Sequence, residues 1–290
     1  MRLAVFHATD YRYGEPASDS FNELRLRPAD DYRQTVLSFE VEVEPKVPLR
    51  SHLDYYGNAT HHFHIAGEHR SLRVVTRSVV TTYPIPDPLP VPAEVLPDLR
   101  HRFFEYLAPT ARVPLDRDWF STFGALYLTP EGDLLSFLDQ LTGYLRGRFT
   151  YRGDTTDVET PLAEFATHGT GVCQDYTHAM LALCREAGVP ARYVSGYVHP
   201  HPGGDERMLG AEGSHAWLEA FLPGSGWVGF DPTNGCRVSE AHVKVAVGRD
   251  YDDVPPLRGL RRGGGRSTMT VDVRVRSAEQ HEPGELAPVD

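Results

Sequence analysis

One cysteine in this sequence stands where a thiol can act as a nucleophile. Cys173 follows two glycines and opens a helical stripe in the segment GTGVCQDYTHAMLALCREAGVP. This pattern predicts a helix that starts near Gly171 and ends at Gly188-Val189-Pro190. A thiol in the first helical turn lies at the positive end of the helix dipole, which favours the reactive thiolate. The alternative is an inert packing residue, the usual state of a free cysteine.

The other two cysteines serve as a comparison. Cys184 follows eleven residues later at nearly the same helical angle, but deep in the predicted helix, so we expect it to pack in the core. Cys236 follows a predicted strand, in a turn, and receives no role. An odd number of cysteines without CxxC spacing makes a poor disulfide framework and favours a reducing cytosol.

A nucleophilic thiol needs a base, and the base needs a group that orients it. His215 opens one predicted strand, and Asp231 lies near the end of the next. With an odd number of loop residues between the strands, Asp231 pairs with Trp217, and His215 becomes its diagonal neighbour at roughly 7–8 Å. An even loop would put Asp231 on the opposite face. We therefore predict an odd loop or a bulge, and a triad of Cys173, His215 and Asp231.

Each of these residues also has an ordinary structural explanation. His215 alone is typical of a hydrogen-bonded strand histidine, and Asp231 alone is typical of a turn residue before proline. Trp217 and Trp227 are expected to wall the triad against water, or to pack the sheet. The combination and order of the three triad residues favour the functional interpretation.

A run of histidines, His61-His62-Phe63-His64, suggests a metal site because His62 and His64 share a strand face. No cysteine or carboxylate has helpful spacing to it, so a solvated or edge-strand face is the better interpretation. We predict no metal site.

Two segments of the chain resemble the core of the transglutaminase-like superfamily in its bacterial branch. They are GVCQDYTHAMLALCREAGVPARYVSGY and SHAWLEAFLPGSGWVGFDPTN, and the resemblance is specific over residues 137–235. Leu24-Arg25-Leu26-Arg27-Pro28 and Tyr56-Gly57-Asn58 resemble the domain that precedes this core. The resemblance implies an α+β fold. An N-terminal antiparallel β-domain would precede a papain-like, transglutaminase-core domain whose nucleophile helix packs on an antiparallel sheet.

The resemblance also implies a thiol enzyme that acts on amide or acyl carbonyls through a thioester, as an amidase, a protease or an acyltransferase. Its substrate would be a protein or peptide, through glutamine or a backbone amide. The backbone N–H of Cys173 can donate to the oxyanion. We expect the second donor to be Tyr151, Gln140 or Trp119, and the sequence does not choose among them. No cofactor is expected, and calcium sites like those of the large animal transglutaminases are not evident.

Three other functions compete with this interpretation. One is a non-catalytic binding module with a relict cleft, against which the complete set of Cys, His and Asp argues. Another is acyl transfer of the arylamine acetyltransferase kind, whose usual sequence around the nucleophile differs from GVCQDY. A redox or zinc protein is disfavoured by the cysteine spacing. The sequence leaves open whether water or an amine resolves the thioester, and it leaves the oligomeric state open.

The patterning divides the chain into four parts. Residues 1–83 alternate like antiparallel strands, as in SFEVEVEP. Residues 84–97 hold six prolines and are predicted to be an extended connector. Residues 98–277 are expected to form the catalytic core, with helices at 98–108 and 131–146 and a C-terminal strand. Residues 278–290 are a polar tail.

Bulk properties exclude several classes of protein. Lys plus Arg is 29 and Asp plus Glu is 40, so the net charge is −11, which argues against general binding to nucleic acid or anionic membranes. The N-terminus has no apolar stretch typical of a secretory signal, and no run is long enough to span a membrane. We therefore predict a cytoplasmic protein.

Overall fold

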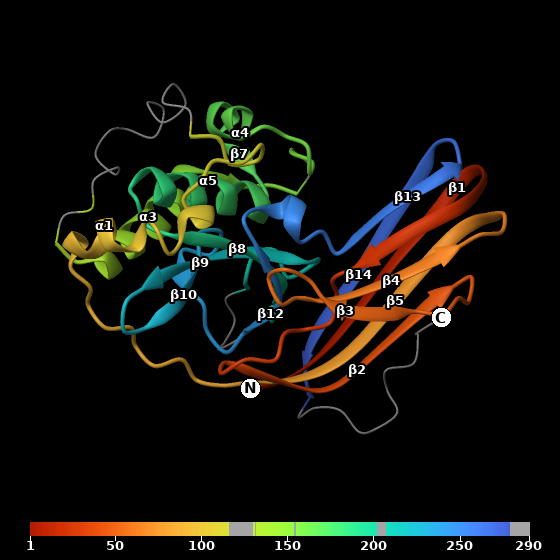
Figure 1. Cartoon of the computed structure of the whole chain (residues 1–290), viewed down its shortest axis with the longest axis horizontal. Helices are drawn as coiled ribbons and strands as arrows, with labels where there is room; N and C mark the ends of the chain where they lie inside the picture. The colour runs from red at the N-terminus through yellow and green to blue at the C-terminus, as the bar shows by residue number, and fades with distance from the viewer. Residues whose placement is uncertain (116–129, 131, 154, 202–206, 279–290) are drawn as a thin grey trace.

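The computed structural model describes residues 1–115, 130, 132–153, 155–201 and 207–278. It has the α+β fold that the sequence predicted, and most of its elements are strands (Figure 1). An N-terminal antiparallel sheet lies beside a core in which helices cover a second sheet. Among the described helices, none is long and apolar enough to cross a membrane.

Seven strands form the N-terminal sheet, in the order β2-β5-β1-β4-β3, with β13 and β14 also paired to β1. They are β1 (Arg2–Leu24), β2 (Gln34–Glu44), β3 (Arg50–Leu53), β4 (Ala59–Ile65), β5 (His69–Thr82), β13 (Leu257–Gly263) and β14 (Ser267–Ser277). β1 is the centre of the sheet. Its first half pairs with β5 and β14, and its second half pairs with β4 and β13.

β1 exchanges one partner strand for another at a bend in the sheet. Tyr13 is the last residue of β1 paired with β14, and Ala17 is the first paired with β13. On the opposite strand Gly263, Gly264 and Gly265 have φ values of 70°, 85° and 56°, a left-handed conformation that glycine adopts at little cost. These glycines therefore let β13 and β14 follow β1 through the bend.

The placement of the C-terminal strand corrects our domain division. We expected the strand around residues 267–277 to belong to the catalytic core, but β14 pairs with β1 in the N-terminal sheet. Val273 and Val275 are buried while Met269 and Val271 are exposed, so only half of the predicted apolar face is covered. Alternation predicts which face of a strand is buried, but it does not predict which strand pairs with it.

The core sheet has five antiparallel strands in the order β11-β10-β9-β8-β12. They are β8 (Ala191–Val198), β9 (His215–Leu222), β10 (Gly226–Asp231), β11 (Cys236–Arg237) and β12 (His242–Gly248). A separate parallel pair joins β6 (Thr150–Tyr151) to β7 (Thr170–Gly171).

Helices cover one face of this sheet. They are α1 (Leu96–Leu99), α3 (Leu134–Arg148), α4 (Leu162–His168) and α5 (Cys173–Glu186), with short 3-10 turns η1 (Ala93–Val95), η2 (Phe104–Tyr106) and η4 (Tyr251–Asp253). α5 packs on β9 and β8 and contacts α3 and α4 on its other sides (Figure 1). This enclosure buries nearly every residue of α5, so close packing holds the first turn of the helix in one position.

Two helical predictions had different outcomes. α3 matches the predicted helix, and the Asp133 carboxylate caps it by accepting hydrogen bonds from the N–H groups of Leu135 and Ser136. The helix predicted over 98–108 was wrong, because this stretch holds only the end of α1 and the η2 turn. Phe103 turns inward to contact Phe221, with ring centroids 4.2 Å apart. Tertiary packing of this ring overrides the local helical pattern.

Two side-chain amides join the N-terminal sheet to the edge strand β12. The Gln34 amide donates to the Lys244 carbonyl and accepts from the Lys244 N–H, each at 2.8 Å. The Asn58 amide makes the same two bonds with Val247, each also at 2.8 Å. Edge-strand groups that would otherwise lack a strand partner are thereby satisfied.

Candidate active site

Cys173 is the first residue of α5, as predicted, and Val172 alone separates it from the end of β7. The Asp175 carboxylate fixes this turn, because it accepts from the Val172 N–H at 2.8 Å and from the Thr156 hydroxyl at 2.6 Å. The thiol is 9% exposed, and its Sγ lies 4.0 Å from the Ser214 carbonyl oxygen. The sulfur therefore lies between the helix start and the residue that precedes His215.

The hairpin of β9 and β10 has the odd loop that we predicted. Gly226 pairs with Leu222, and Phe230 pairs with Leu218, so the register continues to place Asp231 opposite Trp217. His215 and Asp231 are both fully buried, and the His215 Nε2 lies 2.8 Å from the Asp231 Oδ2. The hairpin register thus brings the expected base and orienting group into direct contact.

The charge state of His215 follows from its neighbours. Burial alone would lower the pKa of His215, but the Asp231 carboxylate and the Cys173 sulfur outweigh burial and raise this pKa to about 10. Nε2 faces the carboxylate, and Nδ1 makes no hydrogen bond of ordinary geometry. Cys173 is therefore close enough to influence the pKa of His215 although Nδ1 makes no such hydrogen bond with it, which is compatible with a catalytic pair because such bonds often tighten only when substrate binds.

The Asp231 carboxylate accepts from an unusually full set of donors. Its Oδ2 accepts from the Asn234 side chain at 2.7 Å and lies 3.2 Å from the His242 Nε2, in addition to His215. Its Oδ1 accepts from the backbone N–H groups of Thr233 and Asn234. Although burial raises the pKa of Asp231, these donors and the neighbouring imidazoles hold it well below its usual range.

Asn234 and His242 are contacts of Asp231 that we did not predict from the sequence. Asn234 had a usable signal, since it lies three residues after Asp231 in the turn that Asp231 starts. His242 had none, because it begins a strand whose position beside Asp231 is set by tertiary structure.

A short loop covers His215. The Asn234 side chain accepts from the Leu209 N–H at 2.8 Å and donates to the Leu209 carbonyl at 3.2 Å, which ties this loop to Asp231. The next residue, Gly210, has a φ of +80°, and a Cβ there would lie 2.4 Å from the His215 Nδ1. The backbone of Gly210 therefore lies directly against the imidazole.

Comparison with known proteins identifies the family of this chain. Residues 3–81 match the family model of the bacterial transglutaminase-like N-terminal region, and residues 126–232 match that of the transglutaminase-like superfamily. An uncharacterised protein of Mycobacterium leprae is 34% identical over 280 residues, covering 94% of this chain and 98% of that protein. The chain belongs to the transglutaminase-like superfamily.

Two further relatives have more specific descriptions. A protein-glutamine gamma-glutamyltransferase of Pseudomonas aeruginosa is 39% identical over 101 residues, which cover 33% of this chain and 15% of that enzyme. The crystal structure of a candidate cysteine protease from Cytophaga hutchinsonii aligns with a TM-score of 0.73 and 21% identity, over 97% of this chain and 92% of that one. This structural likeness supports the fold and not a particular activity.

The three predicted oxyanion donors differ in where they lie relative to Cys173. Tyr151 pairs with Gly171, two residues before Cys173. Burial raises the pKa of Tyr151 well above its usual value, as do the charges of Cys173 and Glu212, so its hydroxyl stays a neutral donor. Gln140 is exposed on α3, and Trp119 lies outside the described residues. The role of oxyanion donor stays a prediction for all three.

The two predicted wall residues are separated. Trp217 is buried beside His215, with 6.1 Å between the two ring centroids. Trp227 lies at the other end of the hairpin, where its ring packs edge to face on Phe103 and Phe221. Trp227 therefore fits the sheet-packing interpretation, because a shared strand face says nothing about distance along the strand.

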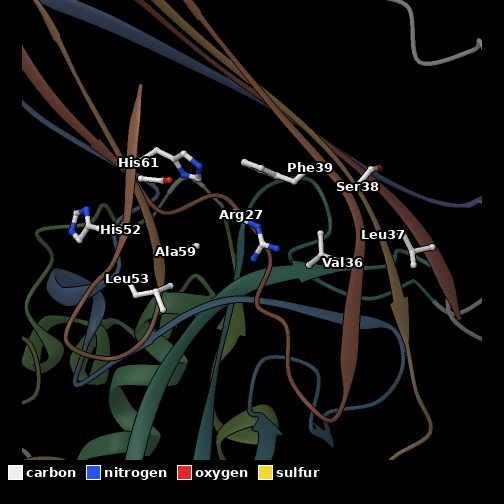
Figure 2. A pocket seen from close by; sticks show the side chains of 10 residues that line it. Arg27, Val36, Leu37, Ser38, Phe39, His52, Leu53, Ala59 and His61 are labelled. Carbon is white, nitrogen blue, oxygen red and sulfur yellow. The ribbon is translucent and has the colours of Figure 1, made fainter. Parts of the chain in front are cut away.

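The histidine run lies outside this centre. Among the described residues, the group whose ligand atoms approach closely enough for a metal is His215, Asp231 and His242, and their hydrogen bonds already account for these atoms. His64 instead stacks on Phe21 at 4.0 Å, and His61 lines a groove of about 540 Å³ on the N-terminal sheet. Figure 2 shows Arg27 in this groove, between residues of β2 and residues of β3 and β4. No triad residue lines it.

Proposed function

We propose that this protein is a thiol enzyme that attacks amide or acyl carbonyls through a triad of Cys173, His215 and Asp231 and a thioester intermediate. The observation that carries the proposal is the position of the His215 imidazole. One ring nitrogen is held by a buried carboxylate at 2.8 Å, while the ring interacts with a thiol in the first turn of a helix. This is the arrangement that nucleophile, base and orienting group require.

The mechanism follows from the charges. The imidazolium of His215 stabilises the Cys173 thiolate, which attacks the substrate carbonyl carbon. The backbone N–H of Cys173 at the helix start donates to the resulting oxyanion, and the Tyr151 hydroxyl is the second donor that the neighbouring β6-β7 pair favours. His215 then gives its proton to the leaving amine, and a thioester on Cys173 remains. Water resolves it in a hydrolase, and a primary amine resolves it in a transferase.

We further propose a protein or peptide as the substrate, through a glutamine side chain or a backbone amide. The family membership supports this class of substrate. The cytoplasmic location stays a prediction.

Alkylation by iodoacetamide, read by mass spectrometry, tests the triad. Cys173 should react fast near neutral pH and should lose this reactivity in His215→Ala. Cys184 and Cys236 are internal controls, because burial raises the pKa of each thiol to about 12. Cys173 labelling as slow as that of Cys184 would contradict the proposal. Incubation with glutamine peptides, with and without a primary amine, then separates hydrolysis from transfer.

A further inference from the structure

A second histidine shares the carboxylate of the proposed triad. His242 is the first residue of β12 and is 4% exposed. Its Nδ1 accepts a hydrogen bond from the Ser239 N–H at 3.2 Å. Because a backbone N–H can only donate, Nδ1 carries the lone pair, and the single proton of the neutral ring lies on Nε2. This N–H then donates to the Asp231 Oδ2, 3.2 Å away.

The surroundings of His242 agree with a neutral donor. Its ring faces the Asp231 carboxylate, the His215 ring at 6.3 Å between centroids and the Trp217 ring at 5.3 Å. Lys244 and Glu219 line a small cavity that it also borders. His215 already supplies one positive charge to the carboxylate, so a neutral His242 completes the hydrogen bonding without adding a like charge.

The fold leaves room for this contact. A Cβ at Gly196 on β8 would lie 2.2 Å from the Val243 carbonyl oxygen and 2.4 Å from the Trp217 ring. The missing side chain therefore lets β12 approach β8 and lets Trp217 pack edge to face on His242. The position of His242 depends on close packing across three strands.

We propose that His242 is a positioning residue, a neutral donor that holds the Asp231 carboxylate in the orientation that His215 needs. This inference rests on the function proposed above. Oδ2 accepts from His215, His242 and Asn234, and the last two are neutral. Neutral donors restrict rotation of the carboxylate and leave its negative charge to attract His215.

Replacing His242 by leucine and by glutamine tests the donor. The glutamine amide nitrogen can reach the position of the imidazole Nε2, whereas leucine fills space without donating. We expect the alkylation of Cys173 between pH 6 and 7 to slow about tenfold in His242→Leu, the effect of losing one hydrogen bond to a charged group. His242→Gln should stay within about threefold of the unaltered protein and keep the shape of its pH profile.

Several outcomes would overturn the inference. An unchanged rate in His242→Leu would mean that the donor is dispensable. A loss in His242→Gln as large as that in His242→Leu would mean that donation is not what matters. A changed profile in His242→Gln between pH 5 and 7 would mean that His242 acts by titrating.

A matched control separates positioning from general destabilisation. His7 is a buried histidine on β1 with two hydrogen bonds, to Tyr197 and to Thr9. His7→Leu should lower the melting temperature without slowing Cys173 alkylation. If His242→Leu does not fold, His242→Asn replaces it, because the shorter amide cannot reach Asp231. The slower rate is then expected in His242→Asn, and a rate equal to that of His242→Gln would contradict the inference.

The inference and the proposed function can fail separately. The ratio of rates between the unaltered protein and His215→Ala tests the triad, while the ratio between His242→Gln and His242→Leu tests the donor. Nitrogen-15 NMR of the histidine side chains provides a test that needs no reactivity. It should detect the His242 proton on Nε2, and a proton on Nδ1 would overturn the inference even in an active enzyme.

Discussion

Two buried carboxylates on the core sheet have contrasting partners. The Asp231 cluster consists of His215, Asp231, Asn234 and His242, and the Glu219 cluster consists of Arg192, Glu219 and Lys244. His215, Trp217 and Glu219 occupy every second position of β9 and so share one face of the strand. Trp217 therefore lies between the two clusters. In the Asp231 cluster the charged partner is a histidine, and the other donors are neutral. In the Glu219 cluster both partners are permanent cations.

The Glu219 cluster connects strands and domains. Glu219 accepts from Arg192 at 2.7 Å and from Lys244 at 3.0 Å, and it is 2% exposed. Lys244 also pairs with Asp31, outside the core sheet, and its backbone binds Gln34. This cluster lies where β12 meets the N-terminal sheet.

The contrast shows that residues of one strand can be held by permanent cations at one position and by an exchangeable proton at another. The cations Arg192 and Lys244 keep Glu219 ionised over a wide pH range, so Glu219 does not exchange a proton near neutral pH. A histidine beside Asp231 can give and take a proton, because neutral donors satisfy the rest of that carboxylate. We therefore expect changes at Asp231 to alter reactivity and changes at Glu219 to alter stability.

The largest expected effect is that of Asp231→Asn. An amide nitrogen next to His215 would reverse the ring tautomer, and loss of the negative charge would leave the imidazolium unsupported. Turnover of a glutamine peptide should fall on the order of 1,000-fold. Circular dichroism should detect a folded protein. Near-normal turnover in that protein would mean that the Asp231 cluster does not control reactivity.

Glu219→Gln should have the next largest effect, and on stability. It leaves two buried cations facing a neutral amide, so the free energy of unfolding should fall by about 3–5 kcal/mol. Urea unfolding measures this loss. Cys173 alkylation, corrected for the folded fraction, should not change, and a parallel loss of reactivity would contradict the comparison.

The two clusters should respond to pH in opposite directions. Burial raises the pKa of Glu219, but Lys244 and Arg192 outweigh it and lower this pKa to about 2. The stability that Glu219 contributes is therefore present above its unfolded pKa of about 4.3 and is lost as pH falls toward 2. His215 has a raised pKa, so its contribution is present below about 6.5 and is lost as pH rises toward 10.

Urea unfolding from pH 2 to 10 measures both contributions. The stability difference between the unaltered protein and Glu219→Gln should shrink only in acid. The difference from His215→Ala should shrink only in alkali. A shared pH window for both variants would show that the clusters do not titrate separately.

A smaller effect is expected from Gly210→Ala, which adds one methyl group against the His215 Nδ1 and changes no hydrogen bond. Its left-handed backbone should cost about 1–2 kcal/mol of stability. Displacement of the imidazole should slow Cys173 alkylation roughly 10- to 100-fold. Gly224→Ala has a similar positive φ away from the triad, so it should cost stability alone.

Gln34→Ala is expected to have the smallest effect on reactivity, because it should change stability alone. It removes two hydrogen bonds to the Lys244 backbone and should lower the free energy of unfolding by about 1–3 kcal/mol. Alkylation of Cys173 should be unchanged, and Asn58→Ala is the matched variant at Val247. A rate that falls with Gln34→Ala would mean that the domain joint also controls the Asp231 cluster.

Local patterns predicted much of the candidate site. The helix start at Cys173 and the odd hairpin between His215 and Asp231 depend on a few neighbouring residues, so their geometry could be inferred from spacing. His242 could not be found this way. Its contact with Asp231 depends on the missing side chain of Gly196 and on the turn that brings β12 back across the sheet.

Sequence patterns alone were enough to infer which residues are buried and which helix and hairpin hold the proposed triad residues, because periodicity and loop parity act over a few residues. Three other features could be known only from the folded chain: β14 joins β1, Phe103 interrupts the helix expected over 98–108, and Gln34 satisfies the edge of β12. These contacts join residues far apart in the chain. Their choice of partner depends on shape and on unsatisfied backbone groups, which exist only once the sheets have assembled.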